Sequence, residues 1–242
     1  LCIIQLKETN IHFSIKHIKS IATYAGPIFI GGAATFTLSG MDRWLLAEHF
    51  GATQIAAYAI AIKFALVPAL LIQPFTLWWF PKRFSVLKEL DGKNINAHFA
   101  VVGAIISVLI CGSLGLLGPL LIQHLTPASY HSAIVILPWL LLCTLLKMLS
   151  DLLNLGCFVE KSSKVQMNIN LAASAIGGLL LILLVPLFRI NGALIALIVA
   201  GFIRLVLFYY FSQKKIYLPY KFCYLYPAIS AAVIATWFGQ VS

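Results

Sequence analysis

The sequence has few charged residues and very few acidic ones. Of its 242 residues only 10% are charged, with 7 Asp or Glu against 17 Lys or Arg. Soluble globular proteins carry about 25% charged residues, so this scarcity excludes an ordinary soluble domain. The hydrophobic content of 61% and the mean hydropathy of +0.97 instead indicate a chain suited to a lipid bilayer.

Motifs of soluble enzymes and of cofactor sites are also missing. The sequence contains no GxSxG, P-loop, HExxH or GxGxxG pattern, so we expect no enzymatic activity and no cofactor. The five cysteines, Cys2, Cys111, Cys143, Cys157 and Cys223, show no CxxC spacing, and four lie in or beside apolar runs. We therefore expect buried free thiols and neither disulfides nor a metal site.

A net charge of +10 would fit a nucleic-acid-binding protein. The basic residues, however, lie in short clusters between apolar runs, which is typical of membrane proteins. Nucleic acid is therefore not expected as a partner.

Seven apolar runs approach the twenty or so residues that a helix needs to cross a bilayer. They cover residues 20–46, 53–80, 97–122, 132–156, 166–188, 190–212 and 222–239. The second run contains Lys63, Pro68 and Pro74, which predicts a kinked helix. The predicted fold is an all-α polytopic membrane protein with about seven transmembrane helices.

The connections between these runs alternate in charge. Twelve of the 17 basic residues lie in one set of connections: Lys7, Lys16, Lys19, Lys82, Arg83, Lys88, Lys93, Lys161, Lys164, Lys214, Lys215 and Lys221. The other set, around residues 47–52, 123–131 and 189–191, contains only Arg189. The positive-inside rule then predicts a cytoplasmic N-terminus and a C-terminus on the outer side.

Three stretches of the sequence resemble segments of one transporter family. "SGMDRWLLAEHFGATQIAAYAIAIKF" is similar to the seventh span and following turn of its members, with Asp42–Arg43, Gly51 and Tyr58 at matching positions. "PASYHSAIVILPWLLL" resembles the start of their tenth span. "LVPLFRINGALIALIVAGFIR" resembles their eleventh-to-twelfth turn, where the family often has Gly at the position of Arg189. The family that these stretches resemble is the polysaccharide and lipid-linked-oligosaccharide flippases of the multidrug/oligosaccharidyl-lipid/polysaccharide exporter superfamily.

The resemblance implies twelve to fourteen spans in two six-helix lobes around a central cavity. Residues 1–19 would be a cytoplasmic linker from a preceding N-terminal lobe, 20–212 the C-terminal lobe, and 213–242 a cytoplasmic loop with an additional transmembrane helix. The implied function is export of undecaprenyl-diphosphate-linked oligosaccharides for O-antigen or capsular polysaccharide, in a bacterial inner membrane. The implied partners are this lipid-linked cargo, membrane lipids, the N-terminal lobe and polysaccharide assembly proteins.

Six ionisable residues fall inside the predicted spans, where such groups are costly and therefore informative. They are the bases Arg43, Lys63, Lys147 and Arg204 and the acids Asp42 and Asp151. The excess of bases favours a lipid diphosphate over a cationic cargo. We predict that the four bases bind the diphosphate in turn as it crosses, and that the two acids tune their charge or hold a cation.

Structural interpretations of the same residues stay open. Asp42 and Arg43 lie near the outer end of their span and could reach the headgroups. Lys63 lies roughly 14 Å into the membrane, too deep for that, and ranks with Arg43 as a cavity residue. Lys147 and Asp151, spaced i, i+4, could neutralise each other, so Lys147 ranks last.

Two other functions are weighed against the flippase. One is a cation-coupled multidrug exporter of the same fold. The other is a membrane-embedded glycan polymerase or acyltransferase that uses outer-loop histidines such as His49, His124 or His131. The short outer loops leave little room to build such an enzyme site.

Overall fold

The computed structural model describes residues 15–49, 52–158, 164–230 and 232. Its long helices are α2 (Ile15–His49), α3 (Ala52–Leu71), α4 (Gln73–Val86), α5 (Gly92–Leu125), α6 (Ala133–Leu152) and α7 (Lys164–Lys215). Three short helices, η1 (Ala128–Tyr130), η2 (Leu155–Phe158) and η3 (Phe222–Tyr224), lie between or after them. The described residues contain no strand, so the predicted all-α class is confirmed.

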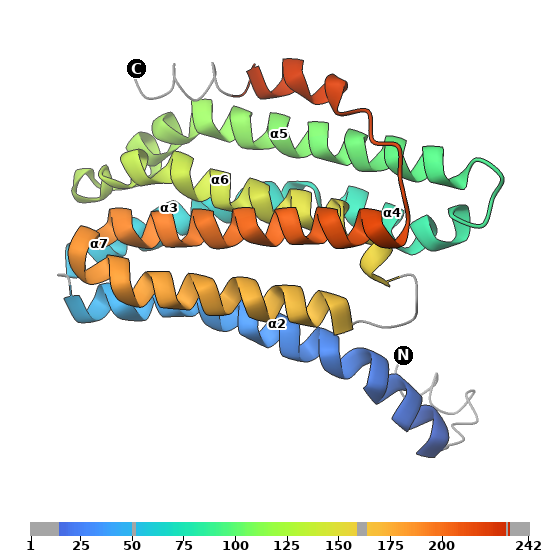
Figure 1. Ribbon diagram of the computed structural model, residues 1–242. Helices are drawn as coiled ribbons and strands as arrows, with labels where there is room; N and C mark the ends of the chain where they lie inside the picture. The colour runs from blue at the N-terminus through green and yellow to red at the C-terminus, as the bar shows by residue number, and fades with distance from the viewer. Residues whose placement is uncertain (1–14, 50–51, 159–163, 231, 233–242) are drawn as a thin grey trace, which may run out of the picture.

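The helix α7 folds back on itself at Arg189, and its two arms run antiparallel within the bundle (Figure 1). Arg189 has φ 56° and ψ −133°, a backbone conformation outside the helical region. Close by, the backbones of the two arms approach so closely that a Cβ on Gly192 would lie 2.2 Å from the carbonyl oxygen of Leu184. The arms correspond to the expected runs 166–188 and 190–212.

The helices α3 and α4 form one bent unit, with a 47° change of direction around Ile72. Pro74 lies at the start of α4. Because proline has no backbone N–H, it cannot donate the hydrogen bond that would continue the preceding helix at this position. The kink predicted for the run 53–80 is therefore confirmed.

Among the described residues, three helices are long and apolar enough to cross a membrane: α5, α6 and α7. The bent α3–α4 pair adds a fourth if it counts as one span. The helix α2, which holds the expected run 20–46, is not among them. Much of the run 222–239 and of the linker 1–19 lies outside the described residues. The architecture is thus compatible with a membrane-embedded helical protein, while the count of seven spans is not confirmed.

The main core joins α2, α3, α6 and both arms of α7. Leu46, Tyr58, Leu137, Leu181 and Val185 are all almost completely buried in it. Many large apolar side chains point outward, among them Phe29, Trp44 and Leu70. Such an apolar exterior is what a bilayer would cover.

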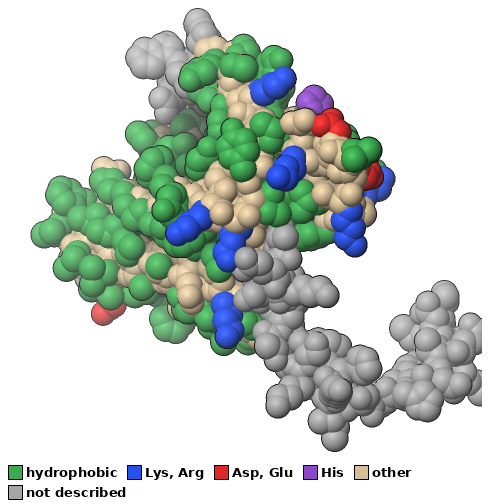
Figure 2. All heavy atoms as spheres, turned by 45° about the vertical axis from the view of Figure 1, so that its right-hand side comes forward, with side chains coloured by type: hydrophobic (Ala, Val, Ile, Leu, Met, Phe, Trp, Pro, Cys, Tyr) green, Lys and Arg blue, Asp and Glu red, His purple; other side chains and the backbone are tan. Residues whose placement is uncertain are grey.

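The connection from α4 to α5 and the segment that follows α7, which both carry lysines, lie at one end of the bundle, on the right in Figure 1. When this end is turned forward, Lys and Arg side chains are spread over it (Figure 2). Exposed lysines of this end are Lys82, Lys88, Lys93, Lys214, Lys215 and Lys221. Arg83 differs from them, because it is 7% exposed and its Nη1 donates to Asn154 Oδ1 at 3.0 Å. Lysines from connections that are separate in the sequence therefore lie together at one end of the bundle. The side of the membrane that this end faces stays a prediction.

Candidate functional site

A cleft of about 420 Å³ lies between α2, α3, α6 and α7. Four of the six predicted intramembrane residues line it, namely Asp42, Arg43, Lys147 and Arg204. Its other walls are mostly small or apolar side chains, such as Ile62, Leu140 and Ala173. Tertiary packing thus brings residues from three helices into one charged cleft, which we call the basic cleft.

One end of the basic cleft is built around Asp42, which is 2% exposed. Its carboxylate accepts a hydrogen bond from the Tyr58 hydroxyl at 2.6 Å and one from the Arg43 backbone N–H at 2.7 Å. These two donors hold the buried carboxylate in one orientation, which offsets part of the cost of burying it. The Arg43 side chain is exposed and lines the cleft beside it.

The other end is built around Arg204, whose side chain is 13% exposed. Its Nη2 donates to Asp151 Oδ1 at 3.0 Å, and its Nε donates to Asn170 Oδ1 at 3.0 Å. The guanidinium also lies 5.3 Å from the centre of the Phe208 ring. Three elements therefore fix its position: α6, the first arm of α7 and the second arm.

The partner of Asp151 is Arg204 and not Lys147. The i, i+4 pair considered for Lys147 and Asp151 does not form, because Asp151 instead pairs across the helix–helix interface. In the part of the chain that the structure describes, Lys147 makes no ion pair and is exposed at the basic cleft. Its charge is therefore available to an anion.

The two ends of the basic cleft are separated along the bundle. The helix α2 runs opposite to α6 and to the second arm of α7 (Figure 1). Arg204 donates to Asn170, whose side chain lies close to Gly31 of α2, twelve residues before Arg43. Between Gly31 and Arg43 the helix α2 rises about 18 Å, so Arg204 and Arg43 lie at different levels of the bundle.

Lys63 is not brought to the basic cleft. Its neighbour Ile62 lines the cleft, but Lys63 is exposed and does not. Successive helical side chains point about 100° apart, so the depth of a residue along a span does not decide which way it faces. The expectation that Lys63 shares a cavity with Arg43 is not met at this site.

Reasoning from the sequence missed two residues that shape the basic cleft. Asn170 is 2% exposed and holds Arg204; an amide inside an apolar run was the signal that could have found it. Thr144 donates its hydroxyl to the Ala65 carbonyl at 2.8 Å and ties α6 to α3. Tyr58 was noted through the family resemblance, and the structure adds its contact with Asp42.

The described residues contain no cluster of potential metal ligands, and their cysteines are free. In residues 15–49, 52–158 and 164–230, no group of three or more His, Cys, Asp or Glu could hold a metal ion. The cysteines described there, Cys111, Cys143, Cys157 and Cys223, are free thiols, and Cys223 is exposed. Cys2 lies outside the described residues.

The fold and the basic cleft define a class, an all-helical bundle with apolar outer surfaces and a charged cleft between its helices. No protein-family model, no curated protein and no solved structure matches the chain. The resemblance to the flippases therefore rests on the residues quoted for it.

Proposed function

We propose that the protein moves the diphosphate of a lipid-linked oligosaccharide across the membrane, with the basic cleft as its path. One observation carries this proposal: Arg43, Lys147 and Arg204 come from three different helices and line one cleft. Basic groups inside an apolar helical bundle are costly, so their convergence on one space favours an anionic ligand.

The charge balance of the basic cleft supports an anion further. Asp151 pairs with Arg204, and Asp42 lies beside Arg43, so the three bases and two acids together leave one positive charge at the cleft. Among the described residues, Arg43 and Lys147 make no ion pair. A diphosphate would therefore find a guanidinium fork at one end and an ammonium group at the other.

The spacing of the bases suggests how the cargo passes. The bases line the cleft at different levels along its helices, so a headgroup can contact them in turn. A headgroup would first contact Lys147, and Arg204 if it exchanges Asp151 for phosphate, and later Arg43. Each contact must be weak enough to release, so a relay of single charges suits transport better than one tight site.

The test is charge removal in a bacterial strain that lacks its own flippase and is complemented with the full-length protein. Arg43→Gln and Lys147→Gln should each lower surface glycan about tenfold or more, since a hydrogen bond to a charged group contributes roughly 1.5–3 kcal/mol. Lys63→Gln is the matched control, because Lys63 is also a base on an apolar helix, but its side chain is exposed and does not line the cleft. Membrane fractions should contain equal amounts of each variant.

Two results would reject the proposal. The first is wild-type export by both cleft variants at normal insertion. The second is a loss in Lys63→Gln as large as in the cleft variants, because the location of the charge would then not matter.

A cation-coupled multidrug exporter is the second candidate, and the buried carboxylate of Asp42 favours it. An acid inside a membrane bundle can bind a proton, sodium or an organic cation. If this function holds, Asp42→Asn should abolish efflux of a cationic dye, while Arg43→Gln and Lys147→Gln should leave it intact. The opposite pattern, with glycan export lost in the two base variants, supports the diphosphate.

A further inference from the structure

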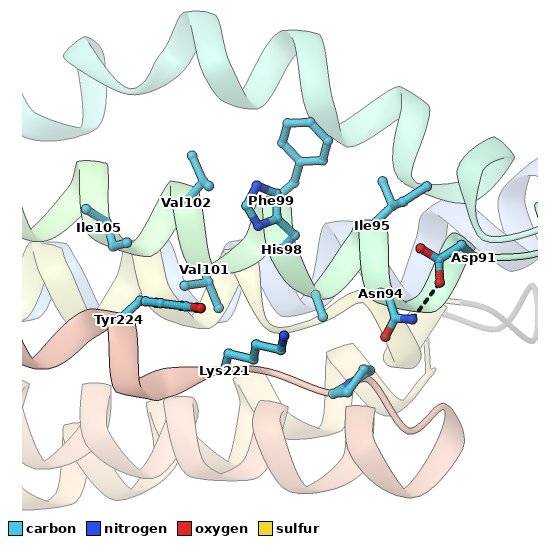
Figure 3. A pocket seen from close by; sticks show the side chains of 12 residues that line it. Asp91, Asn94, Ile95, His98, Phe99, Val101, Val102, Ile105, Lys221 and Tyr224 are labelled. Atoms are coloured by element: carbon cyan, nitrogen blue, oxygen red, sulfur yellow. Dashed lines mark hydrogen bonds between the residues drawn. The ribbon is translucent and has the colours of Figure 1, made fainter.

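A second and larger cleft lies between the first half of α5 and residues 219–224, which follow α7 (Figure 3). Its volume is about 840 Å³, within the range of about 300–1,000 Å³ that small-molecule sites occupy. It shares no lining residue with the basic cleft. We call it the α5 cleft.

One part of the α5 cleft is polar and carries both signs of charge. Its polar lining residues are Asp91, Asn94, His98, Lys221 and Tyr224. Asn94 donates to the Asp91 carboxylate through its side-chain amide, which orients one carboxylate oxygen and leaves the other open. In Figure 3 the Lys221 ammonium and the Tyr224 hydroxyl both point into the cleft, with Asn94 between Lys221 and Asp91. Within the described residues, Lys221 makes no ion pair.

The rest of the α5 cleft is apolar. Val101, Val102 and Ile105 line it further along α5, and the helix rises about 16 Å between Asn94 and Ile105. The polar part lies at the same end of the bundle as the exposed lysines, where a headgroup layer would be (Figure 2). The apolar part runs from there toward the middle of the bundle, which is the direction an acyl chain takes in a bilayer.

We infer that the α5 cleft binds a glycerophospholipid with a phosphoethanolamine headgroup. Its phosphate would lie against Lys221 and Tyr224, and its primary ammonium against Asp91. An acyl chain would follow Val102 and Ile105.

The presence of both charges selects this headgroup among membrane lipids. A purely anionic headgroup would be attracted by Lys221 but repelled by Asp91. A choline headgroup has no N–H to donate to the carboxylate, whereas a primary ammonium offers three donors. This resident lipid would lie at the end of the bundle that carries the exposed lysines, and its binding is independent of the transported cargo.

The experiment is native mass spectrometry of the full protein, delipidated in mild detergent and mixed with equal concentrations of three lipids. Phosphatidylethanolamine, phosphatidylglycerol and phosphatidylcholine of identical acyl chains are compared. Phosphatidylethanolamine should bind about tenfold more tightly than phosphatidylcholine, as expected for one added charge-assisted hydrogen bond. Soluble glycerophosphoethanolamine, which has no acyl chains, should not compete at the same concentration.

Two variants assign the charges. Asp91→Asn should remove the preference for phosphatidylethanolamine over phosphatidylcholine, because the carboxylate that accepts from the primary ammonium is lost. It should not weaken the binding of phosphatidylglycerol, because the repulsion between Asp91 and this anionic headgroup is lost as well. Lys221→Gln should weaken all three lipids, because each has a phosphate. Glu89→Gln and Lys88→Gln are the matched controls, since both residues are exposed near the start of α5 and do not line the cleft. Melting temperatures without lipid show whether each variant is folded.

Several outcomes would overturn the inference. Equal binding of the three lipids would mean non-specific annular contact. Tightest binding of phosphatidylglycerol, unchanged by Asp91→Asn, would mean a simple anion site. Competition by glycerophosphoethanolamine would point to a soluble ligand. Failure of every lipid to bind the folded protein would mean that the cleft is covered by protein and not by lipid. If Asp91→Asn or Lys221→Gln does not fold, Val102→Trp, which fills the apolar part, must still abolish phosphatidylethanolamine binding.

Discussion

The pairing of Asp151 can be tested by a double-mutant cycle, because the sequence and the structure point to different partners. Arg204→Gln removes a guanidinium that is 13% exposed and bonded to both Asp151 and Asn170. The pair is neither fully buried nor fully exposed, since the Asp151 side chain is 38% exposed. Exposed pairs contribute about 0–1 kcal/mol, and losing one partner of a buried pair costs about 3–5 kcal/mol. We therefore expect Arg204→Gln to cost about 2 kcal/mol.

Asp151→Asn should cost less, about 1 kcal/mol, because the more exposed group is partly solvated. The double variant should be about 1 kcal/mol more stable than the sum of the two single effects, which is the coupling energy of the pair. Thermal unfolding in detergent measures this, since 1 kcal/mol shifts the melting temperature by about 2–4 °C for a chain of this size. Arg204→Gln should thus lower it by about 4–8 °C.

The same cycle with Lys147 provides the comparison. Lys147→Gln should change stability by no more than about 0.5 kcal/mol and show no coupling with Asp151→Asn, because Lys147 makes no ion pair in the described residues. Coupling between Lys147 and Asp151 equal to or larger than that between Arg204 and Asp151 would refute the assignment. It would also remove the argument that the charge of Lys147 is available to a diphosphate.

Three further predictions use other features of the chain. Arg189→Gly should be about 1 kcal/mol more stable than Arg189→Ala, because both variants lose the same side chain and only Ala has a Cβ that is strained at φ 56°; an equal or lower melting temperature of the Gly variant would contradict this. Cys223 should react quickly with maleimide at pH 7.5, whereas Cys157 should react slowly. Burial raises the pKa of the Cys157 thiol to about 11, so its labelling rate should rise about tenfold per pH unit up to that value. Similar labelling rates for Cys157 and Cys223 at pH 7.5 would contradict this prediction. In a cysteine-free variant, an impermeant reagent added outside should label Ala128→Cys but not Lys88→Cys, and the reverse result would overturn the predicted orientation.

Local properties of the chain were sufficient for the helical class and for several boundaries. The length of an apolar run decides whether a helix can form and cross a bilayer, so the runs that became α5, α6 and α7 could be located by counting. The kink in the run 53–80 was predicted from its prolines, but not its position, because Pro68 lies inside the continuous helix α3 and the bend comes just before Pro74. The break at Arg189 lies between two runs that the sequence already separated. The ionisable residues inside apolar runs could also be chosen from the sequence, because their rarity in such runs is visible before their partners are known.

The tertiary structure decided which of these residues meet. Rotation of a helix about its axis is set by packing against its neighbours, so the sequence could not show that Ile62 lines the basic cleft and Lys63 does not. Arg204 and Asp151 lie on different helices, and their contact depends on how α6 crosses the second arm of α7. The α5 cleft likewise exists only because residues 219–224 return along α5 after two intervening helices. The sequence pattern of a segment determines which of its residues can be buried. Which residues far apart in the chain come into contact is determined by packing, because all segments must be buried together.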